Sequence, residues 1–138
     1  MRLLLDTCVI IDWLTDADPF ERSVWDILND PDTKLYVSAE TARELIVSFN
    51  NKRLLSKYWK TAEEMLVAMK EEAMVDILPI SERTMFTYSR LTLNEAMDHR
   101  DPSDHVIIAH AITEYITLLS SDTRFWYYRN QGLDLIEY

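Results

Sequence analysis

Four acidic side chains occupy positions in this chain where they could bind a divalent cation together. Asp6 and Asp122 each end an apolar run that is predicted to be a buried strand, and Glu44 and Asp104 lie near the starts of two predicted helices. In an open α/β sheet, strand carboxyl ends and the starts of the returning helices meet at the edge where sites form. Clustered carboxylates repel one another unless a cation is bound, and Mg²⁺ and Mn²⁺ prefer oxygen ligands. The pattern therefore predicts a site for Mg²⁺ or Mn²⁺.

Each of these acids also has a purely structural explanation. Asp6 could cap the helix that follows it, and Glu44 completes a capping-box pattern that begins at Thr41. Asp104 lies in a first helical turn, where the helix dipole favours an acid, and Asp122 could initiate a turn. The metal-site prediction depends on all four acids meeting at one edge, because caps and turn residues have no reason to cluster.

Composition indicates one compact domain over residues 1–138 and excludes some classes of function. The chain is 48% hydrophobic, which suits a single core. Its net charge of −10 argues against a generic nucleic-acid-binding module, although an enzyme that meets phosphate through a cation remains possible. The single glycine, Gly132, excludes a Walker loop or a Rossmann fingerprint.

The predicted location is the cytoplasm, without membrane association. Cys8 is the one cysteine, which fits a reducing compartment. Asp6 and Asp12 interrupt the N-terminal apolar run too early for a signal peptide or a membrane span.

Apolar periodicity and turn residues predict strands that alternate with helices. The predicted strands cover 2–5, 35–37, 75–78, 116–119 and 133–136. The predicted helices cover 7–14, 19–29 with Asp18 as its N-cap, 39–49, 53–73 as one or two helices, 81–91 and 102–114. This alternation favours an α/β fold with a mainly parallel central sheet of four or five strands, flanked by helices on both faces.

Four sequence blocks together resemble a PIN domain. They cover residues 3–7, 38–44, 99–111 and 118–122. Their order and spacing, and the chain length, are similar to those of the VapC-type toxins of bacterial and archaeal toxin–antitoxin pairs. The resemblance implies a PIN-like three-layer sandwich and a metal-dependent endoribonuclease that hydrolyses RNA phosphodiester bonds with metal-activated water. It also implies a cognate antitoxin as partner and a homodimer.

The resemblance assigns metal binding and catalysis to Asp6, Glu44, Asp104 and Asp122. Asp101 lies one helical turn before Asp104 and is a candidate auxiliary ligand, although an N-cap is the preferred interpretation.

Three further residues are candidates for substrate contact. The Thr7 hydroxyl could hold water or phosphate, or bond within its own helix. Arg43 and Arg124 are candidate RNA contacts, with an ordinary surface ion pair as the favoured alternative for Arg43. The aromatic stretch 124–129 could stack RNA bases, but core packing is the favoured interpretation.

Some positions depart from the family pattern or carry weaker signals. Ser103 stands where many members have a bulky apolar residue, His105 where many have a basic one, and Cys8 where Asn or His is common. His105 and His110 lack zinc-site spacing and are predicted to be at the surface or half-buried. His99 could contact substrate.

Other phosphoryl-transfer folds are excluded by missing residues. A receiver domain needs a lysine after a late strand, and no lysine follows Lys70. A haloacid-dehalogenase-like phosphatase needs Asp-x-Asp after its first strand, whereas this chain has Asp6-Thr7-Cys8. The remaining alternatives to a toxin are a PIN-domain nuclease of RNA processing and a catalytically silent PIN-like binding protein.

Overall fold

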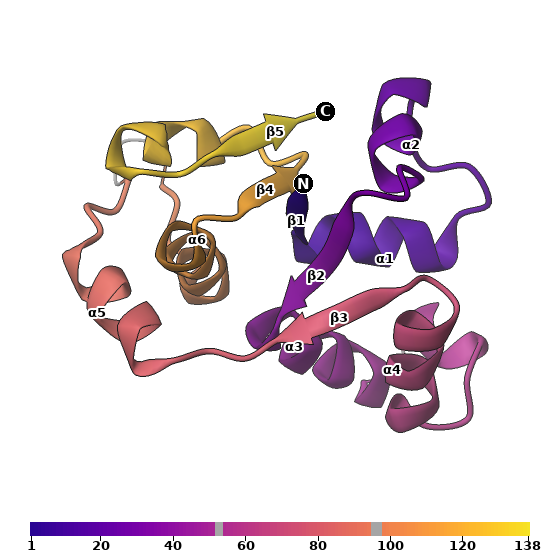
Figure 1. Ribbon diagram of the computed structural model, residues 1–138. Helices are drawn as coiled ribbons and strands as arrows, with labels where there is room; N and C mark the ends of the chain where they lie inside the picture. Colours follow the sequence, from indigo (N-terminus) through magenta and orange to yellow (C-terminus); the bar gives the residue numbers. More distant parts are fainter. Residues whose placement is uncertain (52–53, 95–97) are drawn as a thin grey trace.

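A five-stranded, all-parallel sheet forms the centre of the molecule (Figure 1). The computed structural model describes residues 1–51, 54–94 and 98–138. The strands are β1 (Arg2–Leu5), β2 (Lys34–Ser38), β3 (Val75–Leu78), β4 (Thr117–Ser120) and β5 (Leu135–Glu137). Their order in the sheet is β3-β2-β1-β4-β5, which confirms the predicted α/β class.

Helices connect the strands and cover both faces of the sheet. The α-helices are α1 (Thr7–Thr15), α2 (Arg22–Leu28), α3 (Ala39–Asn50), α4 (Ala62–Glu71), α5 (Glu82–Arg90) and α6 (Pro102–Glu114). Within the described residues, 3-10 helices are η1 (Leu54–Lys57) and η3 (Phe125–Gln131). None of the described helices has the length and apolar character needed to cross a bilayer.

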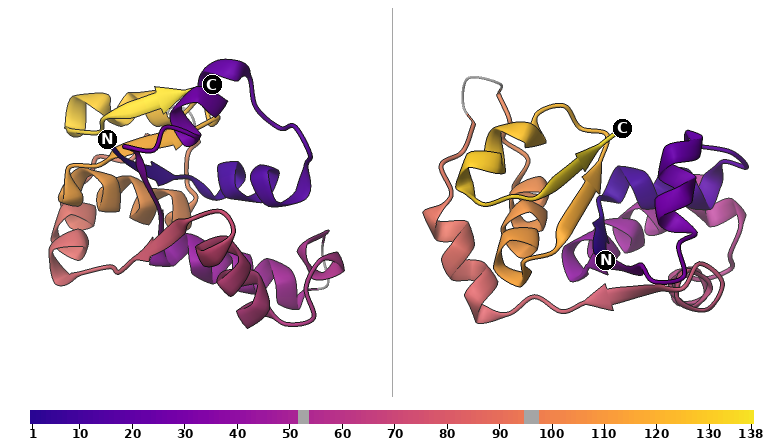
Figure 2. Two further views of the ribbon diagram at one scale, coloured as in Figure 1. Left: turned by 45° about the vertical axis from the view of Figure 1, so that its right-hand side comes forward. Right: turned by 45° about the horizontal axis from the view of Figure 1, so that its top comes forward.

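The sheet separates two apolar clusters, because successive side chains of a strand point to opposite faces. Leu3 and Leu5 pack with apolar residues of α1, α2, α3 and α4 on one face. Leu4 packs with residues of α6 and η3 on the other. Figures 1 and 2 show α6 on one side of the sheet and α1 with α2 on the other. Burial on both faces explains why the sequence of β1 is continuously apolar rather than alternating.

The strand order creates a switch point at the carboxyl ends of β1 and β4. From central β1 the chain proceeds outward through β2 and β3, then crosses back through α5 and α6 to β4 on the other side of β1. Ligands of open α/β sheets bind where the order reverses in this way. Asp6 directly follows β1, and its backbone N–H donates to the Leu119 carbonyl of β4 at 3.0 Å. Asp122 lies two residues beyond β4.

The predicted helix over 19–29 begins too early. In the structure α2 starts at Arg22, with Glu21 and not Asp18 as its N-cap. The Asp18 carboxylate instead accepts a hydrogen bond from the Trp25 indole at 3.0 Å. Phe20 is buried against Trp25. The chain before Arg22 therefore stays non-helical and places the Phe20 side chain in the core.

Two other segments differ from their predictions. The segment predicted as 53–73 contains η1 and α4 with a break between them, and Thr61 caps α4 by accepting from the Glu64 backbone N–H. Part of it, residues 52–53, lies outside the described residues, as do 95–97 of the polar connection. The stretch after Asp122 forms η3, which was not predicted, because an unbroken aromatic run over 125–128 hides any helical period.

The left-handed residue that ends α6 leads to a stability prediction. Tyr115 has φ of 51° and is 90% exposed. A side chain in this conformation costs energy that glycine avoids. We expect Tyr115→Gly to raise the free energy of unfolding by about 1 kcal/mol in denaturant titrations. Glu114→Gly, one residue earlier inside the helix, should lower it by about as much, and stabilisation by both changes would contradict the argument.

Candidate active site

Asp6 is held at the end of β1 by three donors. The Thr7 backbone N–H reaches its Oδ1 at 2.8 Å, so Asp6 also caps α1. The Ser120 hydroxyl and the Cys8 thiol donate to its Oδ2 at 2.7 and 3.3 Å. With only 4% of the residue exposed, burial raises the pKa of Asp6, while these donors oppose the rise. The cap and the predicted site residue are therefore the same carboxylate.

Glu44 is joined to the β1 end through Thr7. The Thr7 hydroxyl donates to Glu44 Oε1 at 2.7 Å and lies 3.0 Å from the Thr41 hydroxyl. The capping box predicted from Thr41 and Glu44 is wrong, because α3 starts at Ala39 and Ser38 caps it by accepting from the Glu40 N–H. One turn into the helix, the side chains of Thr41 and Glu44 are free to reach α1.

Asp104 lies in the first turn of α6 against a buried histidine. Its Oδ2 is 3.1 Å from His99 Nε2, and its side chain is 15% exposed. Burial and the charges of Asp6, Asp101, Asp122 and Glu44 raise the pKa of Asp104 to about 8. This carboxyl is therefore protonated at neutral pH in the chain alone.

Asp122 is paired with Arg124 in a tight turn after β4. Asp122 Oδ1 accepts from the Arg124 backbone N–H at 2.9 Å, which is the predicted turn role. The guanidinium also donates from Nε to Oδ1 at 3.0 Å and from Nη2 to Oδ2 at 2.7 Å. Burial would raise the pKa of Asp122, but the Arg124 hydrogen bonds and charge together leave it below its ordinary value. Arg124 Nη2 also lies 4.0 Å from Asp104 Oδ2.

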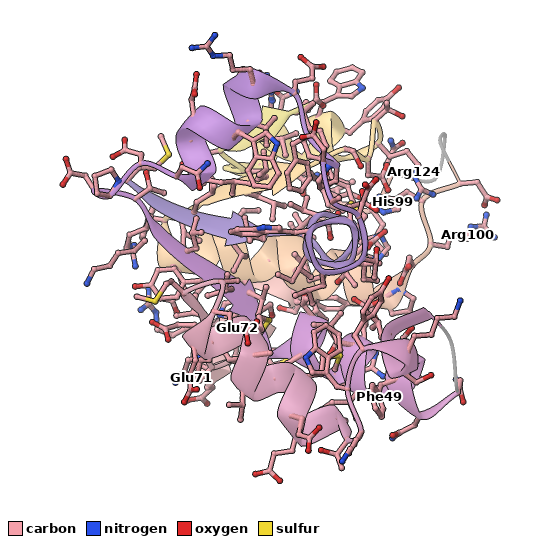
Figure 3. All side chains as sticks on the ribbon, turned by 90° about the vertical axis from the view of Figure 1, so that its right-hand side faces the viewer. Phe49, Glu71, Glu72, His99, Arg100 and Arg124 are labelled. Carbon is pink, nitrogen blue, oxygen red and sulfur yellow. The ribbon has the colours of Figure 1, made fainter. Side chains whose placement is uncertain are left out.

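A cavity of about 440 Å³ brings three of the four predicted acids together. Its lining includes Asp6, Asp104 and Asp122 with Thr7 and Arg124. Glu44 lines an adjoining cavity of about 320 Å³ that also includes Thr7. Thr7 thus connects Glu44 to the other acids. Figure 3 shows Arg124 and His99 close together on this side of the molecule.

Charge at this site is unevenly compensated. Asp122 has the Arg124 guanidinium, whereas burial raises the pKa of Glu44, with Asp101 and Asp6 adding to the rise and the Thr7 hydroxyl opposing it. Carboxylates whose pKa values are raised by one another are stabilised by a bound cation. The donor set is carboxylate oxygen, which suits Mg²⁺ or Mn²⁺.

The auxiliary candidates have structural roles as well. Asp101 caps α6, its Oδ1 accepting from the Ser103 N–H at 2.9 Å, as the preferred interpretation predicted. Its charge still raises the pKa of Asp104 and Glu44. Arg43 forms an ion pair with Glu40 and donates to the Ser103 hydroxyl at 3.0 Å. Ser103, a departure from the family pattern, thereby ties α6 to α3.

Cys8 is a partly buried thiol at the cavity, and two histidines are fully buried. Burial and the Asp6 charge raise the pKa of Cys8 to about 11, so it is a thiol that donates to Asp6. The prediction that His105 and His110 are at the surface or half-buried is wrong, because they are 2% and 0% exposed. His105 Nε2 contacts the His99 carbonyl, and His110 Nδ1 contacts the Ser38 hydroxyl, which accounts for their burial.

Sequence reasoning missed several side chains that position the acids. Ser120 donates to Asp6, and Thr41 contacts Thr7. His99, considered only as a substrate contact, is fully buried behind Asp104. The one available signal was proximity in sequence, since Ser120 and His99 lie within a few residues of predicted acids.

A larger cavity than these two is not lined by the acids. A cavity of about 740 Å³ lies between α5, the end of α6 and η3, with Arg83, Arg90 and Tyr115 in its lining. None of the four acids lines it. We therefore place the candidate site by its ionisable groups and the switch point rather than by volume.

Comparisons with known proteins bear on the family and the fold. A family model described as PIN domain matches residues 3–130. Among solved structures, VapBC2 from Rickettsia felis bound to a promoter DNA fragment matches with a TM-score of 0.74 and 18% identity, over 99% of this chain and 98% of that chain. VapBC-1 from nontypeable Haemophilus influenzae matches with a TM-score of 0.73 and 20% identity, over 99% of this chain and 98% of that chain. FitAcB from Neisseria gonorrhoeae matches with a TM-score of 0.66 and 25% identity, over 98% of this chain and 96% of that chain. A search among curated protein sequences finds no match.

The raised pKa of Asp104 predicts how stability depends on pH in chelator. Asp104 has a pKa of about 8 when folded and an ordinary value of 3.8, so the folded state holds an extra proton between these values. Its contribution to stability is present at low pH and is lost as pH rises toward 8. We expect Asp104 to lower the free energy of unfolding by roughly 1.4 kcal/mol per pH unit from pH 6.5 to about 8.

Denaturant unfolding across this range measures the slope. The fold lowers the pKa of the three histidines, so they add a slope of opposite sign near pH 6.5, which the wild type and the variants share. Asp104→Asn removes the titrating group and should flatten the slope. The matched change Asp101→Asn should leave most of it, because Asn is an equally good N-cap. Equal slopes in the wild type and Asp104→Asn would contradict the assignment of the titration to Asp104.

Proposed function

The chain belongs to the PIN domain family, and from this premise we propose that it is a metal-dependent endoribonuclease that acts as the toxin of a toxin–antitoxin pair. One observation carries the proposal: Asp6, Asp104 and Asp122 line one cavity at the β1–β4 switch point, and Thr7 links Glu44 to it. These acids come from four separate segments of the chain. Capping explains Asp6 locally, but it does not explain why four carboxylates meet.

The chain's own residues fit a divalent cation. Asp6, Asp104 and Asp122 would hold it, with Glu44 at the adjoining side. A bound Mg²⁺ or Mn²⁺ lowers the pKa of water and stabilises charge on the oxygens of an in-line displacement at phosphorus. The protonated state of Asp104 at neutral pH means that a cation takes the place of a proton on this carboxyl.

The other residues of the cavity are suited to bind and orient a phosphodiester. The Arg124 guanidinium is 36% exposed and lies at the cavity beside Asp122, where it can donate to a phosphate oxygen. The Thr7 hydroxyl lies between Glu44 and the cavity, and Glu44 accepts its proton in the hydrogen bond. The Thr41 hydroxyl is then the donor in its contact with Thr7, which leaves one Thr7 lone pair that can accept from a water molecule in the cavity. Cleavage breaks one P–O bond as the water oxygen bonds to phosphorus.

A net charge of −10 does not conflict with an RNA substrate. Attraction to phosphate would come from the cation and from Arg124 at the site, and from Arg43 at its edge, rather than from a basic surface. Because the rest of the surface would attract RNA only weakly, we expect the cleavage rate to depend on the groups at the site more than on the length of the RNA.

We predict that RNA cleavage requires Mg²⁺ or Mn²⁺ and is lost in Asp104→Asn. The expected loss is at least about 100-fold, the upper end of what the loss of a partner of a metal ligand costs. The measurement is the initial rate on defined, labelled RNAs, with circular dichroism to show that the variant is folded.

Asp101→Asn is the matched control, because it is the same chemical change one helical turn earlier on an exposed N-cap. It should retain at least a tenth of the wild-type rate, since Asn caps helices as well as Asp does. Full cleavage by Asp104→Asn in chelator would refute the proposed function and leave a contaminating nuclease as the explanation.

The antitoxin partner is supported by the solved VapBC structures of similar fold and by one surface of this chain. A concave face of about 470 Å³ on α4 combines Trp59 and Val67 with a set of glutamates, which are Glu63, Glu64, Glu71 and Glu72. Figure 3 shows Glu71 and Glu72 on α4, on a different part of the molecule from Arg124. A partner segment with apolar and basic side chains would complement this face.

Expression in a bacterial host tests the toxin role. We expect the wild type to arrest growth and Asp104→Asn not to do so at equal protein level. The proposal requires a small antitoxin gene beside this one, whose product should restore growth on co-expression and co-purify with the chain. Active RNA cleavage in vitro without growth arrest would favour the alternative of a PIN-domain nuclease in RNA processing.

A further inference from the structure

His99 occupies a closed aromatic compartment directly behind Asp104. The residue is 0% exposed. Its ring lies 4.8 Å from the ring of His105, 5.4 Å from Phe125 and 5.6 Å from Tyr128, measured between centroids. His105 Nε2 also lies 2.9 Å from the His99 carbonyl oxygen, so the backbone is fixed as well as the ring. An imidazole held this tightly has one orientation.

Both ring nitrogens of His99 have polar partners. Nδ1 lies 3.1 Å from the Tyr128 hydroxyl, and Nε2 lies 3.1 Å from Asp104 Oδ2. The Tyr128 oxygen accepts from the Asn94 backbone N–H at 3.2 Å. With Asp104 ionised, as it would be beside a bound cation, the arrangement in which every proton has an acceptor has the Tyr128 O–H donating to Nδ1 and Nε2–H donating to Asp104. A backbone amide, a phenol and an imidazole thus form one directed chain that ends on the Asp104 carboxylate.

The geometry also separates His99 from the cavity. Asp104 lines the cavity and is 15% exposed, whereas His99 does not line it and has no exposed side-chain surface. An ion in the cavity would meet Asp104 before it could reach Nε2. His99, Asp104 and Asp122 offer possible ligand atoms within 4.8 Å of one another, but Nε2 of His99 is already in contact with Asp104 and faces away from solvent. This geometry suits His99 to orient a ligand, and whether it also coordinates the ion is decided by the test below.

We propose that His99 is a positioning residue that fixes Asp104 through Nε2–H and leaves the second carboxylate oxygen directed to the cation, with Tyr128 selecting the imidazole tautomer. This inference rests on the proposed metal site and adds to it a residue outside the four acids. Hydrogen-bonded partners of metal-ligating carboxylates orient the ligand, and their loss costs 10–100-fold in metal affinity.

Two amide substitutions distinguish the role of Nε2 from the role of Nδ1. The side-chain amide of Gln reaches the place of Nε2, and that of Asn reaches the place of Nδ1. His99→Gln can therefore still donate to Asp104, whereas His99→Asn can still contact Tyr128 but not Asp104. A purely space-filling or stabilising role predicts no such difference in metal binding.

The test is Mn²⁺ binding to the intact chain by calorimetry, which needs no RNA. We expect His99→Asn to weaken Mn²⁺ binding about 10- to 100-fold, and His99→Gln to restore affinity to within about threefold of the wild type. Tyr128→Phe, which keeps the ring volume, should weaken binding less than His99→Asn does. His110→Gln is the matched control, since His110 is equally buried but contacts Ser38, and its Mn²⁺ affinity should equal that of the wild type.

The outcomes distinguish this inference from the proposed function. Equal Mn²⁺ affinity in the wild type, His99→Asn and His99→Gln would overturn the positioning role and leave the metal site intact. Absence of Mn²⁺ binding by the wild type would overturn both. Pulsed electron paramagnetic resonance of bound Mn²⁺ should show no directly coordinated imidazole nitrogen, and the appearance of one that disappears in His99→Gln would make His99 a ligand and refute the positioning role.

Discussion

Repulsion among carboxylates at one end of the sheet is the constraint on which the site depends. Asp6, Asp104 and Asp122 line one cavity, with Glu44 next to it, and burial together with the neighbouring acidic charges raises the pKa of Asp104 to about 8. Such a cluster lowers the stability of the chain alone, because ionised carboxylates must share a partly buried space. The cluster persists because its members lie at the ends of β1 and β4 and in the first turn of α6. The packing of these elements against one another fixes the acids in place.

Neighbouring groups compensate each carboxylate differently. Asp6 accepts from a backbone amide, a hydroxyl and a thiol, whereas Asp122 is paired with a guanidinium. Asp104 has an imidazole N–H on one oxygen and the like charges of the other acids around it. Asp104 is therefore the member whose charge is least well compensated, and its protonation state responds most to a bound cation. For the same reason, Asp104 is the carboxylate for which a metal ion and a proton compete most strongly.

The core and the site share side chains. Tyr128 is fully buried in the cluster that contains Leu4 and residues of α6, and its hydroxyl contacts His99. Ser120 belongs to β4 and donates to Asp6. Because interiors are close-packed, these groups cannot shift independently of the sheet. The site is thus rigid where the strands end, and substitutions in the adjoining core are expected to disturb it.

The sequence by itself determined the α/β class and the bounds of β1, β3 and α6 to within a residue, because apolar period and capping residues are local signals. It also singled out the four acids as candidates, because carboxylates at strand ends are a local signal as well. It did not place the start of α2, where burial of Phe20 overrides an ordinary N-cap pattern, nor did it indicate η3. Only the tertiary structure decided that His99 lies behind Asp104. That contact joins a loop, α6 and η3, and interactions between distant segments follow from packing rather than from sequence spacing.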